Sequence, residues 1–538
     1  MNLGKLFLFI LPLTICTFIL LSFPDYSISK IQQESLTPGQ VKNILKAGRC
    51  FVDSNLSGLD LSGWDLSKID GYHVDLSHSD LSNAKITDAF LISSTLNNAN
   101  LKGANLSGIK LEDTGMIKAD MSNADLNCAV MIGCSISAAV LTKSNLRGAY
   151  IKDTDLNSSD LTNSDLSYVF FINSNFKNAD VSNSDMHGAC LSNIQLNDVT
   201  MKGVNLSGAK IEKIFMNGTP QKHADFSKAN LNHAIILSGQ MEGADFRGAY
   251  LSGAFIRLCA LEAANLSNSD LSNALIVESN LKKTDLRYAG MANAKLRKTN
   301  LSGANLSDAD MKNADLKDVK LNGAILERTN FEKASFRNTT FRKADMRNAI
   351  LRNASLNNAD LTRANLSGCD LRDAELKNAN LCDVNLNNSD LSKTNLSGAD
   401  LSKAKMNNVK LKEAKLVCAN LTGADLSGVN LSGLDLSGAI LKDADLEGAN
   451  LSNSILKNAE LAGVDLNGAA LNNSDLSNAN LKNADLRNAN LKNADFQGAN
   501  LKGADFTGCN IRLIKNLEKA KNTAKAKGLS PQSSPPDR

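Results

Sequence analysis

A large apolar residue recurs at every fifth position over most of this 538-residue chain. In residues 424–438, for example, the sequence "ADLSGVNLSGLDLSG" has Leu at each of these positions. The register runs without insertion or deletion from Leu56 to Ile511, which is 92 pentads, and only Gly71 and Gln221 depart from the apolar rule. Eleven of the twelve methionines fall on this position. We call it the central residue of the pentad.

The other pentad positions are polar or small. Two places before the central residue stands Ala, or less often Ser, Thr, Val or Cys, and the residue between them is mostly Asp or Asn. A period of five fits neither an α-helix nor a flat strand. Residues two apart face the same side of an extended segment, whereas Asn, Asp, Ser and Gly tolerate tight turns. The pattern therefore predicts a solenoid with stacked Leu and Ala columns inside and outward residues on either side of each central residue.

The A(D/N)LxX pattern resembles the pentapeptide repeat family over residues 56–511. The resemblance implies an all-β fold, a right-handed quadrilateral β-helix with four pentads, or 20 residues, per coil. The 92 pentads would then make about 23 coils. At roughly 4.8 Å per coil, the rod would be on the order of 110 Å long.

A solenoid exposes unpaired backbone at its ends, so each end needs a cap. Residues 25–50 form the predicted N-terminal helical cap, in front of the repeat domain at 51–511. In "SLTPGQVKNILKAG" Thr37 suits the N-cap, Pro38 the first turn and Gly48 the end of a helix. The apolar face of this helix would consist of Val41, Ile44 and Leu45.

The C-terminal end is predicted to carry a second helical cap at residues 512–528, "LIKNLEKAKNTAKAKG" being its main part. Its apolar face would consist of Leu513, Leu517 and either Ala520 or Ala524. Residues 529–538, "LSPQSSPPDR", have the composition of a disordered tail.

Residues 1–24 form a separate targeting segment. Lys5 precedes an apolar run of 18 residues, 6–23, which Pro24 and Asp25 follow. This pattern is typical of a secretory signal peptide or an uncleaved signal anchor. We therefore expect an exported protein, in the periplasm, the envelope or the medium, that stays at the membrane if the segment is not cleaved.

The sequence shows no pattern of a catalytic or metal-binding site. His73 and His78 are one pentad apart and His223 and His233 two pentads apart, so neither pair would converge on one face. There is no CxxC pair, HExxH motif or glycine-rich phosphate loop. The Asp before each central residue is interpreted as a turn residue. We therefore expect no enzyme activity, no cofactor and no metal. We also expect no disulfide framework, because four of the ten cysteines occupy the inward small site: Cys134, Cys259, Cys369 and Cys509.

Outward positions become apolar along two lines of residues 20 apart, which would stack on one face each. The first line holds Phe90, Val130, Tyr150, Phe170, Cys190 and Tyr250, with Ile92, Ile132 and Ile172 beside it and Lys110, Lys210 and Asn230 as interruptions. The second, on the next face, holds Phe215, Ile235, Phe255 and Leu275, with Leu237 and Val277 beside it. An exposed apolar surface of this length marks a protein or membrane contact. Two alternatives stay open: strand-favouring residues that only thicken the wall, and a local segment that covers them.

Two smaller departures from the repeat stand out. Pro220, the only proline within the repeats, lies beside Gln221, which predicts a kink or bulge, either a tolerated defect or a hinge or binding notch. Residues 281–372 hold 18 Lys and Arg against 10 Asp and Glu, a net charge of +8. Arg297, Lys317 and Arg337 would stack there as a basic stripe, suited to an anionic polymer or to solvation alone.

These features predict a non-enzymatic exported scaffold that binds a protein partner, or assembles with itself, through its apolar outward residues. A second hypothesis is a protein anchored in a membrane or envelope by residues 6–23, contacting an anionic polymer. A third follows from the resemblance, since some pentapeptide repeat proteins mimic DNA and protect type II topoisomerases. Those proteins are shorter, strongly acidic and cytoplasmic, whereas this chain has a net charge of +3 and an export segment. Nucleic acid is not an expected partner.

Overall fold

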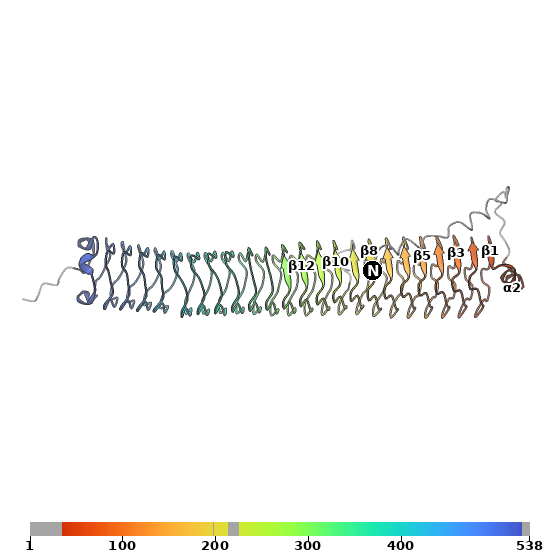
Figure 1. The fold of residues 1–538 in the computed structure, drawn as a ribbon, viewed down its shortest axis with the longest axis horizontal. Coiled ribbons are helices and arrows are strands. Elements are labelled where there is room, and N and C mark those ends of the chain that lie inside the picture. The colour runs from red at the N-terminus through yellow and green to blue at the C-terminus, as the bar shows by residue number, and fades with distance from the viewer. Residues whose placement is uncertain (1–34, 197, 213–224, 530–538) are drawn as a thin grey trace, which may run out of the picture.

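The computed structural model describes residues 35–212 and 225–529, apart from residue 197, as one long rod (Figure 1). Successive turns of the chain stack along the rod axis, with helix α2 at one end and three short helices at the other. The predicted export segment and residues 530–538 of the predicted tail lie outside the described residues.

One side of the rod is a parallel sheet of 13 strands stacked in chain order. Each strand pairs with the strand one turn later, so the sheet spans about twelve turns. Each strand has three residues, with the central residue buried in the middle and an outward residue on either side. The strands are β1 (Cys50–Val52), β2 (Asp70–Tyr72), β3 (Phe90–Ile92), β4 (Lys110–Glu112), β5 (Val130–Ile132), β6 (Tyr150–Lys152), β7 (Phe170–Ile172), β8 (Cys190–Ser192), β9 (Lys210–Glu212), β10 (Ile235–Leu237), β11 (Phe255–Arg257), β12 (Leu275–Val277) and β13 (Lys295–Arg297).

The other sides of the rod stack through single-residue parallel bridges between positions 20 apart. Asn55 pairs with Asp75, Asp60 with Asp80 and Asp65 with Lys85, and the fourth side carries the sheet. Beyond β13 the fourth side continues in the same manner, from the pair Lys295–Asp315 to the pair Asp495–Lys515. Four pentads therefore make one turn, and the predicted all-β solenoid is confirmed.

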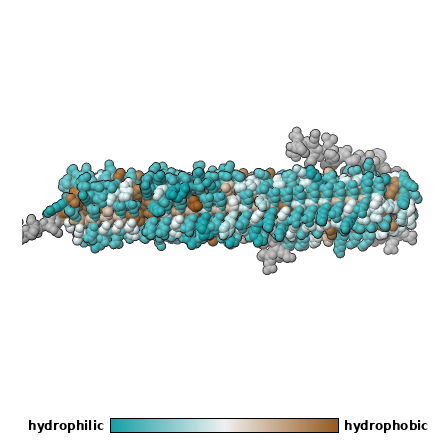
Figure 2. All heavy atoms as spheres, turned by 90° about the horizontal axis from the view of Figure 1, so that it is seen from below, coloured by the Kyte–Doolittle hydropathy of each residue, from teal (hydrophilic) through white to brown (hydrophobic). Residues whose placement is uncertain are grey.

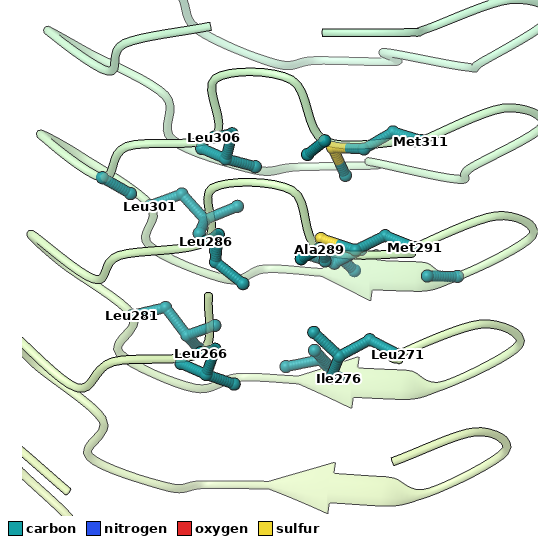
Figure 3. Close-up of a cluster of buried hydrophobic side chains, with 14 of the residues drawn as sticks. Leu266, Leu271, Ile276, Leu281, Leu286, Ala289, Met291, Leu301, Leu306 and Met311 are labelled. Atoms are coloured by element: carbon teal, nitrogen blue, oxygen red, sulfur yellow. The ribbon is translucent and has the colours of Figure 1, made fainter. Parts of the chain in front are cut away.

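The interior is a dry column of central residues stacked over one another. The apolar central residues described between Leu56 and Phe506 are at most 2% exposed. Figure 3 shows Leu266, Leu286 and Leu306, one turn apart, in line inside the coil. Each buried Leu contributes about 1.5–3 kcal/mol relative to an exposed one, so stability comes mainly from contacts between neighbouring turns.

The polar positions of the pentad build the corners. Asn83, two residues after a central Leu, has a φ of 55°, and the same corner position is left-handed in pentad after pentad. Asn and Gly adopt this conformation most readily, which accounts for their abundance. The Asp before the central residue also supports the corner, because Oδ1 of Asp80 accepts hydrogen bonds from the Ser82 amide and from Asn100 Nδ2, each at 2.9 Å. The aspartates are turn residues in this repeat.

The corner that follows the sheet differs from the other corners. In an ordinary corner the amide of the inward small residue donates to the central carbonyl, as Ser269 does to Leu266 at 3.2 Å. After a sheet strand, the amide of Cys259 donates instead to the hydroxyl of Ser279, one turn later, at 3.1 Å. The Ser279 hydroxyl in turn donates to the Val277 carbonyl at 3.0 Å. The amide after a sheet strand thus donates to a side-chain partner from the next turn, which explains why Ser, Thr or Cys replaces Ala at many inward small positions after the sheet.

The substitution Ser279→Ala is expected to lower the free energy of unfolding by about 1–3 kcal/mol, because it leaves the buried amide of Cys259 without its acceptor. Ser269→Ala is the matched control: Ser269 is equally buried, but its hydroxyl only adds a second bond to the Leu266 carbonyl. Urea denaturation gives the two free energies, and hydrogen exchange of the Cys259 amide locates the effect. If both variants lost the same free energy of unfolding, the Ser279 hydroxyl would not be the acceptor that the Cys259 amide needs.

One turn of the rod is five residues longer than the others. Across it Thr200 pairs with Asp225, Asn205 with Asn230, and Lys210 with Ile235, each pair 25 residues apart. The expectation of a uniform 20-residue coil is therefore wrong at this turn. The five-residue frame survives because the extra length is one whole pentad, but all later residues lie one side further round the rod. Pro220 and Gln221 belong to this turn but lie outside the described residues, so the predicted kink stays a prediction.

The N-terminal cap is the predicted helix, α2 (Pro38–Ala47). Thr37 is its N-cap: the Gln40 amide donates to the Thr37 hydroxyl at 3.4 Å, and the Thr37 amide donates to Gln40 Oε1 at 2.7 Å. Gly48 ends the helix. Val41 is fully buried against the first turn, and Ile44 and Leu45 are partly buried beside it.

The C-terminal cap is not the predicted α-helix. The segment makes one more turn of the solenoid with three 3₁₀ helices, η2 (Ile511–Leu513), η3 (Leu517–Lys519) and η4 (Thr523–Lys525). Left-handed backbone at Asn516 and Asn522 prevents a continuous helix. Bridges from Asp495, Asn500 and Asp505 to the new turn give the last regular coil the backbone partners that a helix would not supply: Lys515, Lys521 and Lys527. Leu517 and Ala520 pack against the core as expected, but Leu513, predicted for the same apolar face, is 42% exposed.

Candidate interaction surface

The outward side chains of the sheet form an apolar surface along one side of the rod, interrupted at β4, β8 and β9. The sequence predicts two apolar lines on neighbouring faces, but β9 pairs with β10 across the longer turn, with Lys210 opposite Ile235. The two lines therefore join end to end on one side. We call this surface the stripe, and it consists of Phe90, Ile92, Val130, Ile132, Tyr150, Phe170, Ile172, Ile235, Leu237, Phe255, Leu275 and Val277.

Three residues assigned to these lines from the sequence are not part of the stripe: Cys190 lies on the sheet as the first residue of β8 but is not a large apolar residue, and the other two are Tyr250 and Phe215. Tyr250 pairs with Asn230 and Asp270 on another side of the rod, because the longer turn shifts every residue after it. Its assignment, and that of Asn230 as an interruption of the stripe, are therefore wrong. Phe215 lies outside the described residues.

The stripe residues are packed side by side and remain open to solvent. Phe170 is 41% exposed and Ile235 39% exposed, and the other members are half-buried by their neighbours. The rings of Tyr150 and Phe170, on adjacent strands, lie 6.5 Å apart between centroids. By contrast, the side of the rod seen in Figure 2 is largely hydrophilic, with apolar residues scattered along it.

The structure extends the apolar surface to two residues that the sequence reasoning missed. Val52 on β1 and Tyr72 on β2 occupy the outward position after the central residue, and they are 55% and 39% exposed. The signal was present in the sequence, since strand-favouring residues at that position mark sheet strands. Cys50, which the repeat pattern left unassigned, is the first residue of β1.

Charged residues interrupt and bound the stripe. Strand β4 presents Lys110 and Glu112, both exposed, between the apolar strands β3 and β5. Strands β6 and β11 each combine an aromatic residue with a cation: Tyr150 with Lys152, and Phe255 with Arg257. Strand β13 presents Lys295 and Arg297, where the apolar character ends.

The repeat pattern and the solenoid are decisive for family membership. A family model described as pentapeptide repeats in 8 copies matches thirteen stretches of the sequence, from residues 50–88 to residues 474–512, and leaves residues 194–223 unmatched. The chain belongs to the pentapeptide repeat family. The unmatched segment contains the residues that make one turn of this pentapeptide repeat protein five residues longer.

Solved pentapeptide repeat proteins are similar to parts of this chain. HetL, involved in heterocyst differentiation regulation in the cyanobacterium Nostoc sp. strain PCC 7120, is 33% identical over 43% of this chain and 89% of its own, with a TM-score of 0.23. QnrB1, a plasmid-mediated fluoroquinolone resistance protein, is 23% identical over 37% of this chain and 90% of its own, with a TM-score of 0.17. AT2G44920 from the Arabidopsis thaliana thylakoid lumen is 34% identical over 18% of this chain and 63% of its own, with a TM-score of 0.12. Among curated proteins, no sequence matches.

The basic stretch at residues 281–372 is a ladder of ion pairs. Arginines that follow a central residue bind the Asp two positions earlier: Arg287 binds Asp285 at 2.7 Å, and Arg372 binds Asp370 at 2.6 Å. These hydrogen bonds lower the pKa of both carboxyls. Arg328 binds Asp308, one turn away, at 2.7 Å. Much of the positive charge is therefore already paired within the chain.

The predicted basic stripe stacks as expected, and one of its three residues is ion-paired. Pairs 295–315 and 315–335 place Arg297, Lys317 and Arg337 in line, one turn apart. Arg297 binds Asp315 at 3.1 Å. A shallow hollow of about 390 Å³ lies nearby on the surface, lined by Arg342, Lys343, Thr362, Arg363, Cys382, Asp383 and Lys403. Two of its cations are also paired, Arg342 with Asp360 and Arg363 with Asp383.

The residues that could perform chemistry are dispersed over the rod. Within residues 35–212 and 225–529, no group of three or more His, Cys, Asp or Glu side chains is placed to hold a metal ion. His73 contacts Asp53 across 3.1 Å on the surface. Burial raises the pKa of the Cys134 and Cys259 thiols to about 11, which makes them poor nucleophiles. Seven of the described cysteines are free thiols: Cys128, Cys134, Cys259, Cys369, Cys382, Cys418 and Cys509.

Proposed function

We propose that this pentapeptide repeat protein is an exported, non-enzymatic scaffold that associates with protein through the stripe. The observation that carries the proposal is the pairing of Lys210 with Ile235, which puts the two apolar lines, on β3–β7 and on β10–β12, on the same side of the rod. Family members are generally non-enzymatic structural or interaction proteins. Half-buried aromatic and aliphatic side chains aligned on a rigid sheet favour a protein contact over a solvated wall.

The double substitution Phe170→Glu with Phe255→Glu is expected to weaken association through the stripe at least tenfold, because it places two charges in the apolar contact. The matched control is Tyr250→Glu with Ile440→Glu, which charges two outward residues on other sides that are 53% and 40% exposed. Light scattering measures self-association, and retention of protein on the immobilised chain from a lysate measures binding of a partner. If both double variants associate as the unsubstituted chain does, the stripe is not the contact surface.

Export is part of the proposal and rests on the apolar run at residues 6–23. Among the residues that the structure describes, no helix has both the length and the apolar composition of a membrane span. Retention of the N-terminal segment would place the same stripe at a membrane or envelope. Cell fractionation tests the proposal, and recovery of the full-length chain in the cytoplasm would contradict it.

The two other hypotheses receive less support. Ion pairing of Arg287, Arg328 and Arg372 with neighbouring carboxylates leaves fewer cations for an anionic polymer. A topoisomerase-binding DNA mimic requires a strongly acidic surface, whereas this chain has a net charge of +3.

A further inference from the structure

We infer that the stripe binds the same surface of a second copy of this chain, in a two-fold dimer whose rods lie parallel and in register. The inference rests on the proposed function of the stripe and names its partner. It follows from how the outward residues of each strand would meet under the possible symmetry operations.

In a parallel dimer the two-fold axis runs along the rod between the two sheets. Each strand then faces the same strand of the second copy, and the two outward residues of the strand exchange places. The residue before the central position therefore faces the residue after it in the other copy. A sequence suited to this arrangement has complementary residues at the two outward positions of every strand.

Five strands meet this condition with apolar residues at both outward positions. On β7, Phe170 would face Ile172 of the second copy, and on β10 Ile235 would face Leu237 of the second copy. The remaining three strands are β3, β5 and β12, with Phe90 and Ile92, Val130 and Ile132, and Leu275 and Val277. Apolar contacts would thus form from β3 to β7 and from β10 to β12, whereas β8, with Cys190 and Ser192, and β9, with Lys210, would contribute none.

The charged strands meet the condition through opposite character. On β4, Lys110 would face Glu112 of the second copy, which gives two ion pairs per dimer. On β6 and β11 an aromatic ring would face a cation of the second copy, Tyr150 opposite Lys152 and Phe255 opposite Arg257. Each cation also contacts a carboxylate of its own chain, Lys152 with Asp153 at 3.4 Å and Arg257 with Glu278 at 3.3 Å. On β13, Lys295 would face Arg297, which Asp315 of its own chain already binds, so no favourable contact forms where the stripe ends.

An antiparallel dimer matches the outward residues less completely. Its two-fold axis runs along the strands, so residues before the central position face each other. If the two stripes overlapped fully from β3 to β12, strand β7 would lie on β8 and Phe170 would face Cys190, not an aliphatic residue. Strand β4 would lie on β11, so Lys110 would face the Phe255 ring and Glu112 would face Arg257, and both contacts are favourable. Strands β3, β5, β10 and β12 would be apolar at every position in either arrangement, but β7 only in the parallel one, and this contact favours the parallel dimer.

The size of the surface suits a reversible dimer. From β3 to β12 the stripe extends over nine strand spacings of about 4.8 Å. With two rows of outward side chains, its surface area is on the order of 500 Å² per copy. A total of about 1,000 Å² is at the lower limit of specific protein interfaces. We therefore expect dissociation in the micromolar range rather than a permanent dimer.

Charge exchange on β4 tests the arrangement with the full-length chain in sedimentation velocity at low ionic strength. Lys110→Glu alone and Glu112→Lys alone each create two like-charge contacts, and each variant is expected to dimerise about tenfold more weakly. An equimolar mixture of these two variants is expected to recover the affinity as a heterodimer, because the two carboxylates on β4 of one chain then face the two ammonium groups on β4 of the other. Recovery in the mixture also shows that both variants are folded.

The variant that carries both substitutions, Lys110→Glu with Glu112→Lys, separates the two orientations. It keeps wild-type affinity in the parallel dimer, because the exchanged charges remain complementary. In the fully overlapped antiparallel dimer Glu112 would face Arg257, so the same variant would bring two cations together and dimerise more weakly. In the antiparallel dimer, mixing the two single variants would not restore the dimer affinity either.

Three results would overturn the inference. The first two are a double variant that dimerises more weakly than the unsubstituted chain, and a mixture of the single variants that does not regain the dimer affinity. The third is an unsubstituted chain that is still monomeric at 100 µM, about a hundredfold above the expected dissociation constant. If the dimer failed in this way but Phe170→Glu with Phe255→Glu still abolished binding of a partner, the proposed function would stand without the dimer.

Discussion

Phe336→Ala is expected to lower the free energy of unfolding by about 3–5 kcal/mol, the range for removing a buried phenyl ring from a packed core. Phe331, Phe336 and Phe341 are successive central residues and are fully buried. The Phe336 ring lies 5.1 Å from each of the other two, between centroids, and meets both at steep angles of 74° and 68°. Its removal opens a cavity that two rings line and that the rigid turns above and below cannot fill.

The matched control is Ser335→Ala, which changes the outward neighbour of Phe336 and leaves the column intact. A rod of stacked turns unfolds in segments, because each turn contacts only its neighbours. Hydrogen exchange should therefore show the largest increase within one turn of residue 336 and a smaller one near either end. A loss below about 1 kcal/mol in denaturant, or faster exchange spread evenly along the rod, would contradict this account of the core.

The sequence was sufficient for the architecture because the repeat encodes its own geometry. A central Leu such as Leu301 and a small residue such as Ala304 mark the inward rows, and Asn or Gly marks each corner. The same local logic predicted helix α2, since Thr37, Pro38 and Gly48 act through neighbours a few residues away. Features set by contacts within a pentad or a single helix could therefore be predicted.

The candidate site was only partly predictable because it depends on register between turns. Counting in steps of 20 placed Tyr250 with Phe170, but a turn that is one pentad longer moved Tyr250 to another side. A whole extra pentad leaves the five-residue pattern unbroken, so periodicity cannot reveal it. The apolar lines did contain the signal: shifting the second line by one face makes it continue the first.

The C-terminal cap shows a different limit. Residues 513–528 have helix-favouring composition, with several Lys and Ala, and a helix was the natural prediction. The decisive influence is tertiary, because the last regular turn offers unpaired backbone groups to whatever follows it. The amides of Leu501 and Phe506 donate to the carbonyls of Lys521 and Lys527, each at 2.9 Å, and a helix could not accept them in that spacing.

Deletion of residues 511–538 is therefore expected to abolish solubility rather than shorten the rod harmlessly. The amides of Phe496, Leu501 and Phe506 would lose their acceptors, and their side chains would be exposed at the end of the rod. An open parallel edge with an apolar interior is a template for another chain. Terminal turns with a polar outer surface are what keep solenoids soluble, and lysines at positions 515, 519, 521, 525 and 527 supply that surface here.

The control for this deletion is a chain ending at Leu529, which removes only residues 530–538 and keeps the last turn with its bridges to Asp495, Asn500 and Asp505. The soluble fraction after expression and light scattering at rising concentration compare the two chains. The shorter chain should form large end-to-end aggregates at concentrations at which the control behaves like the full-length protein. Equal solubility would mean that the turn at Leu501 and Phe506 can end the rod by itself, and that the final 3₁₀ turn is an extension of the solenoid and not its cap.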